Sequence, residues 1–457
     1  MCGIFGIYPH KDAAQLACLG LYALQHRGEE SSGIITRNGK KVYLHKALGL
    51  VSDCFDEKNI RGLRGELAVG HVRYSTTGSS NIKNTQPFYV KSKIGDIAIA
   101  HNGNLTNTLI LHKELENNGA LFQTSMDSEI VAHLLAHSQK KDIKEAIIWS
   151  LSKLEGAYSL VLMLDDILIG ARDTQGFRPL CLGKLDGAYI LASETCALDL
   201  IGAQYIRDIK PGETVFIYKD NIESVMSSQQ TRCAFCIFEF IYFARPDSNI
   251  FGESVYLARK RLGRELAREF PVDADIVMPI PDSGTYAALG FAEAAKIPFE
   301  FGMIRNHYIG RTFIQPSQDL RDFRVKIKLN PLRQALYGKR VIVIEDSIVR
   351  GTTSRMRIKT LRLAGAKEVH MRISCPPLRF PCFYGIDFPT KKELVASKHD
   401  IAWIRDFIGT DSLEYLSLEG MLTSMPLAKE NFCTACFDGK YPTTLPKGLS
   451  KEVLEKE

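Results

Sequence analysis

The chain has 457 residues, of which 45% are hydrophobic and 24% are charged. This is the composition of a globular protein, and it excludes collagen-like, low-complexity and strongly charged disordered chains. At about 150 residues per domain, the length predicts two or three domains. No stretch approaches the roughly 18 consecutive apolar residues that a membrane helix needs, so we expect no membrane insertion.

The formal net charge of +6 is unevenly distributed. Residues 1–230 contain 24 Lys and Arg against 25 Asp and Glu, and residues 231–457 contain 34 against 27, which gives net charges of −1 and +7. The second half therefore favours an anionic ligand. Because the chain has no run of five basic residues and no basic stripe interleaved with aromatic residues, we expect a phosphorylated metabolite rather than a nucleic acid.

The start of the chain is apolar but carries no basic leader, and Pro9 and His10 follow within one strand length. This pattern is not that of a secretory signal, so we expect a cytoplasmic protein. In a reducing compartment, the eleven cysteines are expected to be thiols, metal ligands or nucleophiles rather than a disulfide framework.

The first half of the chain is predicted to contain short strands and a few helices. Apolar residues at helical spacing predict helices at 13–25, 128–138 and 143–154. Apolar runs between turn residues predict strands at 67–72, 94–100, 158–164 and 189–193. This order favours layered α and β structure over a simple parallel sheet.

A polar segment, 226–231, is typical of a linker and predicts two domains, 2–230 and 231–457. An amphipathic helix is expected at 253–270. Strands and helices then alternate, at 275–279, 285–295, 340–344, 353–363 and 369–374. This βαβ order predicts a parallel sheet with ligand sites at the carboxyl ends of its strands.

Cys2 is the first candidate for chemistry. If Met1 is removed, the thiol and a free α-amino group share one residue, and an amine with a pKa near 8 can act as the base for the neighbouring thiol. A buried structural cysteine in the first strand is the alternative, and position alone favours it. The polar motifs elsewhere in the first half reverse that preference.

Three polar segments, 25–28, 70–76 and 100–105, directly follow apolar runs. Hydrolysis of an amino-acid amide requires a cation for the α-carboxylate, a carboxylate for the α-ammonium group and N–H donors for the oxyanion. Residues of these types are present at Arg73, Asp127, Asn102 and Gly103.

The segments Met1-Cys2-Gly3-Ile4, His26-Arg27-Gly28, His71-Val72-Arg73-Tyr74-Ser75-Thr76 and His101-Asn102-Gly103-Asn104 resemble the glutaminase domain of the N-terminal-nucleophile amidotransferases. The resemblance implies an αββα domain in which Cys2 attacks the glutamine amide. It implies that Asn102 and the N–H of Gly103 form the oxyanion hole. The glutamine-binding residues that it implies are Arg73, Asp127 and Arg27. Met126 departs from the family, which often has Asp at this position.

The segment 339–353 is a buried strand, two carboxylates and a hydroxyl-rich loop that opens a helix. Glu345 and Asp346 can face ribose hydroxyls and a divalent ion, and the N–H groups of 347–353 can surround a phosphate. An ordinary βα turn with an acidic cap is the alternative. The signature resembles that of type I phosphoribosyltransferases, with Glu345 where close relatives have Asp. The resemblance implies that phosphoribosylpyrophosphate binds to Glu345, Asp346, Ser347, Val349, Arg350, Gly351, Thr352 and Thr353.

Two further loops fit the same chemistry. In the loop 278–285, Ser283 and backbone amides could meet pyrophosphate and its metal, so Ser283, Glu345 and Asp346 are the predicted Mg²⁺ site. The basic loop 305–316 resembles the mobile lid of the same enzymes. Relatives commonly have Lys and Arg where this chain has Arg305 and His307.

Two C-x-x-C pairs occur, at 233/236 and 433/436. Spacing alone predicts four thiolates around zinc or an iron–sulfur cluster. The cysteine segments also resemble those of the cluster-bearing subgroup of amidophosphoribosyltransferases. That resemblance implies a 4Fe-4S cluster held by Cys236, Cys382, Cys433 and Cys436, with Cys233 left over.

From Cys2 to about Pro442 the chain resembles the glutamine phosphoribosylpyrophosphate amidotransferase family. The resemblance implies that glutamine and phosphoribosylpyrophosphate give phosphoribosylamine, glutamate and pyrophosphate, the first step of purine synthesis. It also implies inhibition by purine nucleotides and a homo-oligomer, a tetramer. A different amidotransferase would not need Glu345 and Asp346, and a non-catalytic regulator that senses phosphoribosylpyrophosphate would have no use for Cys2.

Overall fold

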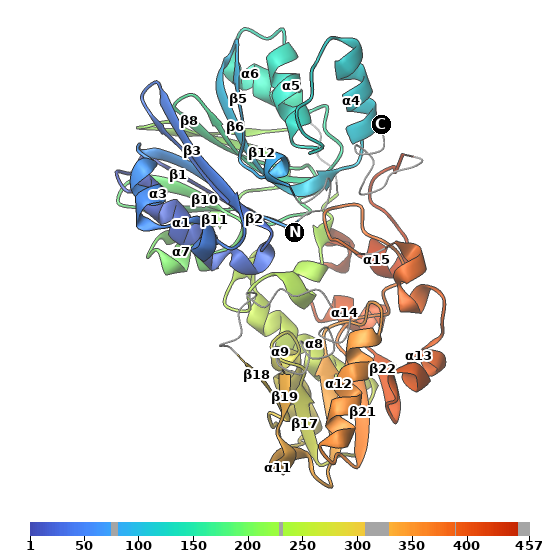
Figure 1. Ribbon diagram of the computed structural model, residues 1–457. Coiled ribbons are helices and arrows are strands. Elements are labelled where there is room, and N and C mark those ends of the chain that lie inside the picture. Colours follow the sequence, from blue (N-terminus) through green and yellow to red (C-terminus); the bar gives the residue numbers. More distant parts are fainter. Residues whose placement is uncertain (75–80, 228–231, 307–328, 389, 447–457) are drawn as a thin grey trace.

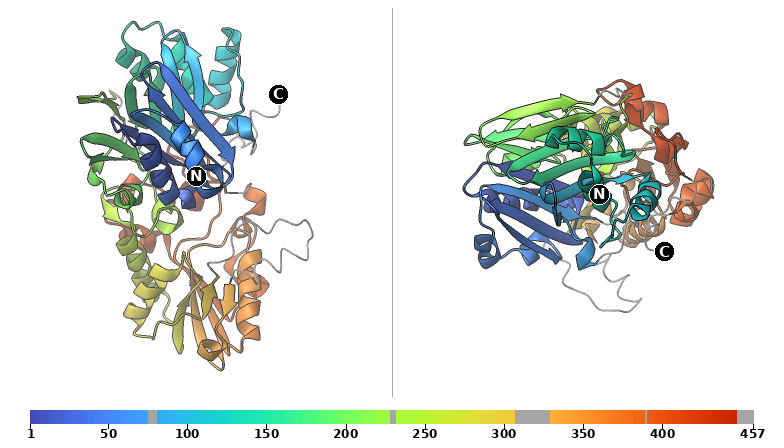
Figure 2. Two further views of the ribbon diagram at one scale, coloured as in Figure 1. Left: turned by 60° about the vertical axis from the view of Figure 1, so that its left-hand side comes forward. Right: turned by 90° about the horizontal axis from the view of Figure 1, so that it is seen from above.

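The computed structural model describes residues 1–74, 81–227, 232–306, 329–388 and 390–446. The first half of the chain forms the upper part of the molecule in Figure 1, the second half forms the lower part, and the N-terminus lies where the two parts meet. The turned views in Figure 2 show the same division. The predicted boundary between residues 230 and 231 lies outside the described residues.

The upper part begins with a seven-stranded antiparallel sheet. Its strands, in sequence order, are β1 (Gly3–Tyr8), β2 (Ser31–Asn38), β3 (Lys41–Leu48), β4 (Leu67–Arg73), β9 (Cys181–Leu185), β10 (Ala188–Ala192) and β11 (Gln204–Asp208). In space they follow the order β11-β9-β10-β1-β4-β2-β3. Buried residues of α1 (Ala13–Ala23) and α7 (Cys196–Leu200) pack on its outer face, and α2 (Val51–Cys54) and α3 (Glu57–Gly62) lie beside α1.

A six-stranded antiparallel sheet packs against the first. Its strands are β5 (Phe88–Ser92), β6 (Gly95–Leu105), β7 (Gly156–Leu164), β8 (Ile167–Arg172), β12 (Glu213–Ile217) and β13 (Ile222–Met226), in the order β13-β12-β8-β7-β6-β5. Its other face is covered by α4 (Thr108–Asn117), α5 (Glu129–His137) and α6 (Ile143–Leu151). An apolar core that includes Ile4, Val69, Ala98 and Val161 joins the two sheets. The predicted αββα architecture is therefore confirmed.

The lower part is built on a four-stranded parallel sheet in the order β17-β20-β21-β22. These strands are β17 (Ile276–Pro279), β20 (Arg340–Glu345), β21 (Glu368–Ile373) and β22 (Ser412–Tyr415). The helices of this part are α8 (Val255–Glu269), α9 (Thr285–Ala295), α11 (Arg333–Leu336), α12 (Thr352–Leu363), α13 (Ile401–Ile408), α14 (Leu418–Thr423) and α15 (Ala435–Asp438). The predicted βαβ arrangement is confirmed, and predicted and observed ends differ by two residues at most.

Short elements complete the described chain. The strands β14 (Phe235–Cys236) and β23 (Phe432–Cys433) pair in parallel, and β15 (Asn249–Ile250) with β16 (Glu253–Ser254) and β18 (Met303–Arg305) with β19 (Leu329–Pro331) pair antiparallel. A π-helical turn, η3, spans Glu239–Phe243. The 3-10 turns are η1 (Gln25–Arg27), η2 (Ile82–Asn84), η4 (Lys391–Glu393), η5 (Val395–Ser397) and η6 (Lys429–Asn431). Among the described residues, no helix combines the length and apolar character needed to cross a membrane.

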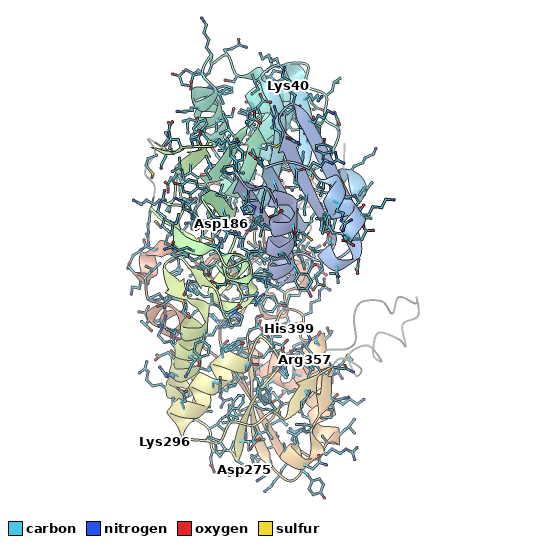
Figure 3. The ribbon with its side chains drawn as sticks, turned by 90° about the vertical axis from the view of Figure 1, so that its left-hand side faces the viewer. Lys40, Asp186, Asp275, Lys296, Arg357 and His399 are labelled. Carbon is cyan, nitrogen blue, oxygen red and sulfur yellow. The ribbon has the colours of Figure 1, made fainter. Side chains whose placement is uncertain are left out.

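The parallel sheet directs the carboxyl ends of its strands toward the upper part. Asp275, just before β17, lies at the far lower end of the molecule, whereas Arg357 lies near the junction (Figure 3). Arg357 contacts Glu345, the last residue of β20. Ligand sites of parallel sheets lie at the carboxyl ends, so this site opens toward the upper part.

Candidate active site

Cys2 lies directly before β1 and beside the end of β4, because the register of the two strands pairs Gly3 with Val72. Its thiol is buried and donates to the carbonyl oxygen of Tyr74 at 3.5 Å. Burial raises the pKa of the Cys2 thiol. Since only the thiolate is a strong nucleophile, Cys2 needs a base to react.

Asn102, on β6 of the second sheet, contacts Cys2 across the interface between the sheets. The N–H of Cys2 donates to Asn102 Oδ1 at 3.2 Å. Asn102 Nδ2 is buried and has no hydrogen-bond partner among the described residues. Such a buried amide costs roughly 1–3 kcal/mol, and it is the kind of donor that stabilises an oxyanion.

Gly103 follows Asn102 and approaches the neighbouring strand closely. Its φ is +156°, and a Cβ at this position would lie 2.0 Å from the carbonyl oxygen of Ala157. A side chain here would force the strands apart, so the backbone beside Cys2 depends on glycine.

Arg73 and Asp127 are both buried. Arg73 ends β4, and its Nη1 lies 4.0 Å from Glu30 Oε2. Asp127 Oδ2 accepts from the N–H of Leu105 at 3.0 Å, and Oδ1 lies 3.3 Å from His101 Nδ1. Burial acts to raise the pKa of Asp127, but the charge and hydrogen bond of His101 and the backbone donors outweigh it and hold the pKa below its usual range. Asp127 is therefore a carboxylate at neutral pH.

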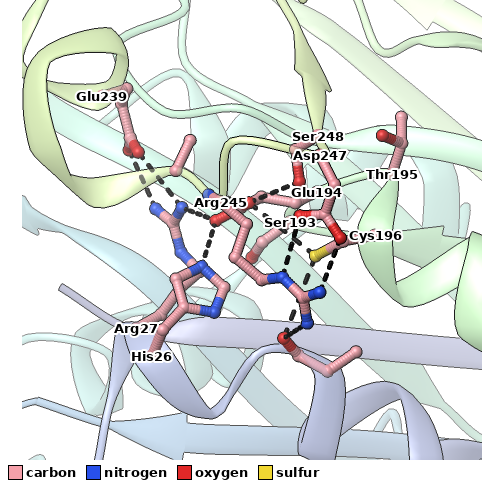
Figure 4. A network of polar contacts seen from close by, with 12 residues as sticks. His26, Arg27, Ser193, Glu194, Thr195, Cys196, Glu239, Arg245, Asp247 and Ser248 are labelled. Atoms are coloured by element: carbon pink, nitrogen blue, oxygen red, sulfur yellow. Dashed lines mark hydrogen bonds and ion pairs between the residues drawn. The ribbon is translucent and has the colours of Figure 1, made fainter. Parts of the chain in front are cut away.

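Arg27, the third residue predicted to bind glutamine, makes buried contacts in this structure. Its side chain is fully buried and pairs with Glu194 and Glu239 (Figure 4). Its Nε donates to the carbonyl oxygen of Cys2 at 2.9 Å. A buried cation must be paired, and these contacts engage Nε, Nη1 and Nη2 of the guanidinium. Arg27 thus contacts the backbone of Cys2, and its predicted role in glutamine binding stays a prediction.

The loop between β20 and α12 forms the second predicted site. Asp346 and Glu345 are both buried, and Gly351 caps α12 with a φ of +77°. Ser354 donates to Glu345 Oε2 at 3.0 Å, and Arg357 contacts Glu345 Oε1. Burial and the Asp346 charge raise the pKa of Glu345 to about 7, although Arg357 opposes them. Both oxygens of Glu345 are thus already engaged, and a metal ion there would compete with these contacts.

Asp346 is placed differently from Glu345. Burial raises its pKa, while hydrogen bonds from Ser283 and Ser347 act in the opposite direction. The predicted partner Ser283, from the loop between β17 and α9, therefore lies at Asp346. Mg²⁺ commonly uses only one or two carboxylates and takes its other ligands from water and substrate phosphates, so this pair fits a Mg²⁺ site.

A cavity of about 910 Å³ connects the two parts of the molecule. Residues 345–354 and Ser283 line its lower side, and His26 and Tyr74 line its upper side. Arg305, the first residue of the predicted lid, also lines the cavity and pairs with Asp282 at 2.5 Å. His307 and the rest of the loop to residue 316 lie outside the described residues.

The four cysteines of the predicted cluster lie together. Cys236 and Cys433 are register partners in the β14–β23 pair. Cys436 interacts electrostatically with Cys433, Cys382 and Cys236. The N–H of Tyr384 donates to Cys382 Sγ at 3.3 Å. Burial raises the pKa of Cys236 to about 11 and that of Cys436 well above its usual value. Such thiols become thiolates only with a compensating cation.

Curated relatives match essentially the whole chain. Amidophosphoribosyltransferases from Synechococcus elongatus and Bacillus subtilis are 49% and 48% identical, over 100% and 97% of this chain and 94% of each relative. The protein of that name from Methanocaldococcus jannaschii is 49% identical over 97% of this chain and 98% of its own length. The chain belongs to the amidophosphoribosyltransferase family.

Solved structures extend this match to three dimensions. A glutamine phosphoribosylpyrophosphate amidotransferase from B. subtilis, in complex with ADP and GMP, is 47% identical with a TM-score of 0.93 over 98% of this chain and 99% of that one. A structure described as the allosteric regulatory enzyme of purine biosynthesis is 47% identical to this chain, with a TM-score of 0.94 over 99% of both chains. A family model for a glutamine amidotransferase domain matches residues 71–200. The predicted glutamine-dependent amidophosphoribosyltransferase activity, the first step of purine biosynthesis, is confirmed.

Some residues around these family sites were not anticipated from the sequence. Glu194 and Glu239 pair with Arg27, and Arg178 joins Glu239. Glu239 stands alone in the apolar run 236–243, and an isolated acid in such a run indicates a buried ion pair. The pattern predicts a buried pair but does not identify the partners, Arg27 and Arg178, which lie 212 and 61 residues away in the chain.

Proposed function

We propose that Cys2 attacks the amide carbon of glutamine and releases ammonia. Arg73 binds the substrate α-carboxylate, and Asp127 binds its α-ammonium group. The oxyanion is bound by Asn102 Nδ2 and the N–H of Gly103. Water then hydrolyses the thioester to glutamate and restores the thiol. The observation that carries this proposal is Asn102 Nδ2, which is buried beside Cys2 and has no hydrogen-bond partner in the part of the chain that the structure describes.

The base for Cys2 is the α-amino group that Cys2 would carry after removal of Met1. An uncharged amine can accept the thiol proton and later return it to the departing ammonia. This role requires a free amine, so retention of Met1 should block glutamine hydrolysis while ammonia is still used as a substrate.

The ammonia attacks the anomeric carbon of phosphoribosylpyrophosphate, and pyrophosphate leaves. The N–H groups and hydroxyls of residues 347–353, at the start of α12, bind the phosphate, since a helix N-terminus is a natural anion site. Asp346 and Ser283 would hold Mg²⁺, with Glu345 close by, and the ion would supply positive charge that neutralises the departing pyrophosphate. Glu345 also holds Arg357 at the sugar site.

The shared cavity supports transfer of ammonia without release to solvent. Tyr74 lines the cavity, and its carbonyl oxygen accepts the hydrogen bond of the Cys2 thiol. A single residue, Tyr74, therefore connects the nucleophile to the cavity that Asp346 also lines. Measurement of pyrophosphate release from phosphoribosylpyrophosphate, with and without glutamine, tests the function as a whole. Pyrophosphate release that does not depend on an ammonia source would contradict it.

The oxyanion role of Asn102 gives a first prediction. Asn102→Asp keeps an acceptor for the N–H of Cys2 but replaces the Nδ2 donor with an oxygen. We expect kcat for glutamine hydrolysis to fall by about 10²–10³-fold, as for loss of other oxyanion donors. Glutaminase kinetics give the value, and a change smaller than about threefold would exclude Asn102 from the oxyanion hole.

The role of Asp346 gives a second prediction. Asp346→Asn removes the charge that faces the metal and ribose, and loss of a charged contact worth roughly 3 kcal/mol corresponds to about a 100-fold fall in kcat/KM for phosphoribosylpyrophosphate. Glutaminase activity measured without phosphoribosylpyrophosphate should persist. If that activity disappeared as well, the substitution would have acted through folding.

By residue type, four thiolates can bind one zinc ion or a 4Fe-4S cluster. The cysteine segments resemble those of the cluster-bearing subgroup of the family, so we propose a 4Fe-4S cluster. The group Cys236, Cys382, Cys433 and Cys436 would hold it, and the bound cluster would cross-link three distant segments.

Purine nucleotides are the proposed regulators. The B. subtilis relative is described with ADP and GMP bound, and feedback by end products suits the first enzyme of a pathway. A homo-oligomer, expected to be a tetramer, and a cytoplasmic location remain part of this proposal.

A further inference from the structure

Two arginines and two glutamates form a buried group where the two parts of the molecule meet. The side chains of Arg27, Arg178, Glu194 and Glu239 are fully buried. Arg178 Nη1 lies 3.4 Å from Glu239 Oε1. Arg27 Nη2 lies 2.8 Å from the same oxygen, and Arg27 also contacts Glu194 (Figure 4). Two positive and two negative charges balance, as a buried group of ions requires. We call these four residues the junction network.

Glu239 is the member of the junction network that comes from the second half of the chain. It begins the π-helical turn η3, and π-turns are frequent at functional sites. Arg259 of α8 donates to the carbonyl oxygens of Phe240, Tyr242 and Ala244 at 2.7, 2.8 and 2.8 Å. These bonds fix the turn and therefore the position of the Glu239 carboxylate.

Arg27 connects this carboxylate to the nucleophile. Its Nε donates to the carbonyl oxygen of Cys2 at 2.9 Å, while its Nη atoms are held by Glu239 and Glu194. The guanidinium is rigid and planar, so the position of the two carboxylates determines the direction of the Nε–H bond. The backbone of Cys2 is thus held through Arg27 by a residue of the other half of the chain.

We propose that Glu239 is a positioning residue for glutamine hydrolysis: from the phosphoribosyltransferase half, it orients Arg27 against the backbone of Cys2. This inference rests on the proposed role of Cys2 as the nucleophile. It implies that the glutaminase half, taken alone, lacks one of the groups that align its own nucleophile. Hydrolysis of glutamine therefore depends on contact between the two halves even when no sugar substrate is bound.

The test is Glu239→Gln in the full-length enzyme. The amide keeps the size of the side chain but removes its charge and turns one acceptor into a donor that faces Arg27. We expect kcat for glutamine hydrolysis to fall about 10- to 100-fold, because small displacements of reacting groups have effects of this size. KM for glutamine should change by less than about twofold, since Glu239 contacts neither Arg73 nor Asp127. Ammonia-dependent synthesis should be unchanged.

Glu213→Gln is the matched control. Glu213 is also buried and forms a two-pronged pair with Arg207 at 2.8 Å, within the first half and away from Cys2. Thermal unfolding of both variants measures the general cost of losing a buried carboxylate. If Glu213→Gln lowered glutaminase kcat as much as Glu239→Gln did, or if Glu239→Gln lowered ammonia-dependent synthesis equally, the positioning role would be overturned.

A double-mutant cycle with Arg27→Lys examines whether Glu239 acts through Arg27. Lysine keeps the charge but cannot contact Cys2 and both carboxylates as the planar group does. We expect Glu239→Gln to cause little further loss of kcat in the Arg27→Lys background. Full additivity of the two losses would overturn the inference.

Two further outcomes are distinguishable. If Glu239→Gln does not fold, Glu239→Asp, which keeps the charge and shortens the reach, should show the same fall in kcat with unchanged KM. Wild-type kinetics of Glu239→Asp would contradict the proposal.

If the wild-type enzyme itself does not hydrolyse glutamine, or Cys2→Ala leaves hydrolysis intact, then the proposed function fails. A normal wild type with an unaffected Glu239→Gln overturns only the positioning role.

Discussion

Cys2→Ala is expected to lower glutamine-dependent synthesis of phosphoribosylamine by a factor of about 10⁴ or more, as loss of a catalytic nucleophile does in other acyl-transfer enzymes. Ammonia-dependent synthesis should be retained. The reason is geometric: Cys2 belongs to the interface of the two antiparallel sheets, whereas Asp346 and its loop belong to the parallel sheet. Rates measured with glutamine and with ammonium chloride in parallel give both values.

Cys54→Ala is a suitable control for this prediction. Cys54 is also a buried thiol of the first half; it ends α2 and packs in the same apolar cluster as α1, so its loss leaves a small cavity without touching either site. Both activities should be normal in this variant. Equal loss of both activities in a folded Cys2→Ala enzyme would contradict the separation of the two sites.

The regular elements were predictable because their signals are local. The helix expected at 253–270 is α8 (Val255–Glu269), in which Val255, Ala258, Leu262 and Leu266 form the buried face. The strand expected at 340–344 is β20, and its residues from Val341 to Glu345 are buried. Periodicity and continuous apolar runs carry this information within a few neighbouring residues, which is why the ends agree so closely.

The first site was only partly predictable. Residue types indicated Cys2, Asn102 and Asp127, and the structure brings Cys2 into contact with Asn102 and Asp127 into contact with His101, the residue before Asn102. Arg27 has the same local signal as Arg73, a basic residue in a polar turn after an apolar run. Its partners Glu194 and Glu239 are 167 and 212 residues away in sequence, and no local pattern encodes pairings at that distance. The role of Arg27 therefore had to come from tertiary structure.

The second site was also only partly predictable from the sequence. The adjacent acids Glu345 and Asp346 look equivalent in sequence, yet strand geometry turns neighbouring side chains to opposite sides. Glu345 meets Ser354 and Arg357 of α12, whereas Asp346 meets Ser283 and Ser347. The sequence alone therefore could not show that the two acids have different partners.

The cysteine group leads to the prediction with the largest effect on the protein as a whole. Cys382→Ser should abolish the broad visible absorbance, the bound iron and the acid-labile sulfide that a 4Fe-4S cluster confers. Cys382 lies far in sequence from both C-x-x-C pairs, and the other ligands lie on β14, β23 and α15. Structural metal sites contribute on the order of 10 kcal/mol to folding, comparable with the whole stability of a typical domain. Loss of the cluster should therefore destabilise the junction and inactivate the enzyme, and exposure to air should do the same.

Cys233→Ser is the matched control, because spacing alone makes Cys233 an equally good ligand. Cys233 is within electrostatic range of Arg172, whereas Cys236, three residues on, is the register partner of Cys433. We therefore propose that Cys236, and not Cys233, joins the group. Iron analysis and visible spectra of anaerobically purified enzyme should show a normal cluster in Cys233→Ser. Stoichiometric zinc without iron, or loss of the chromophore with Cys233 but not with Cys382, would overturn the assignment of the cluster and leave both active sites as described.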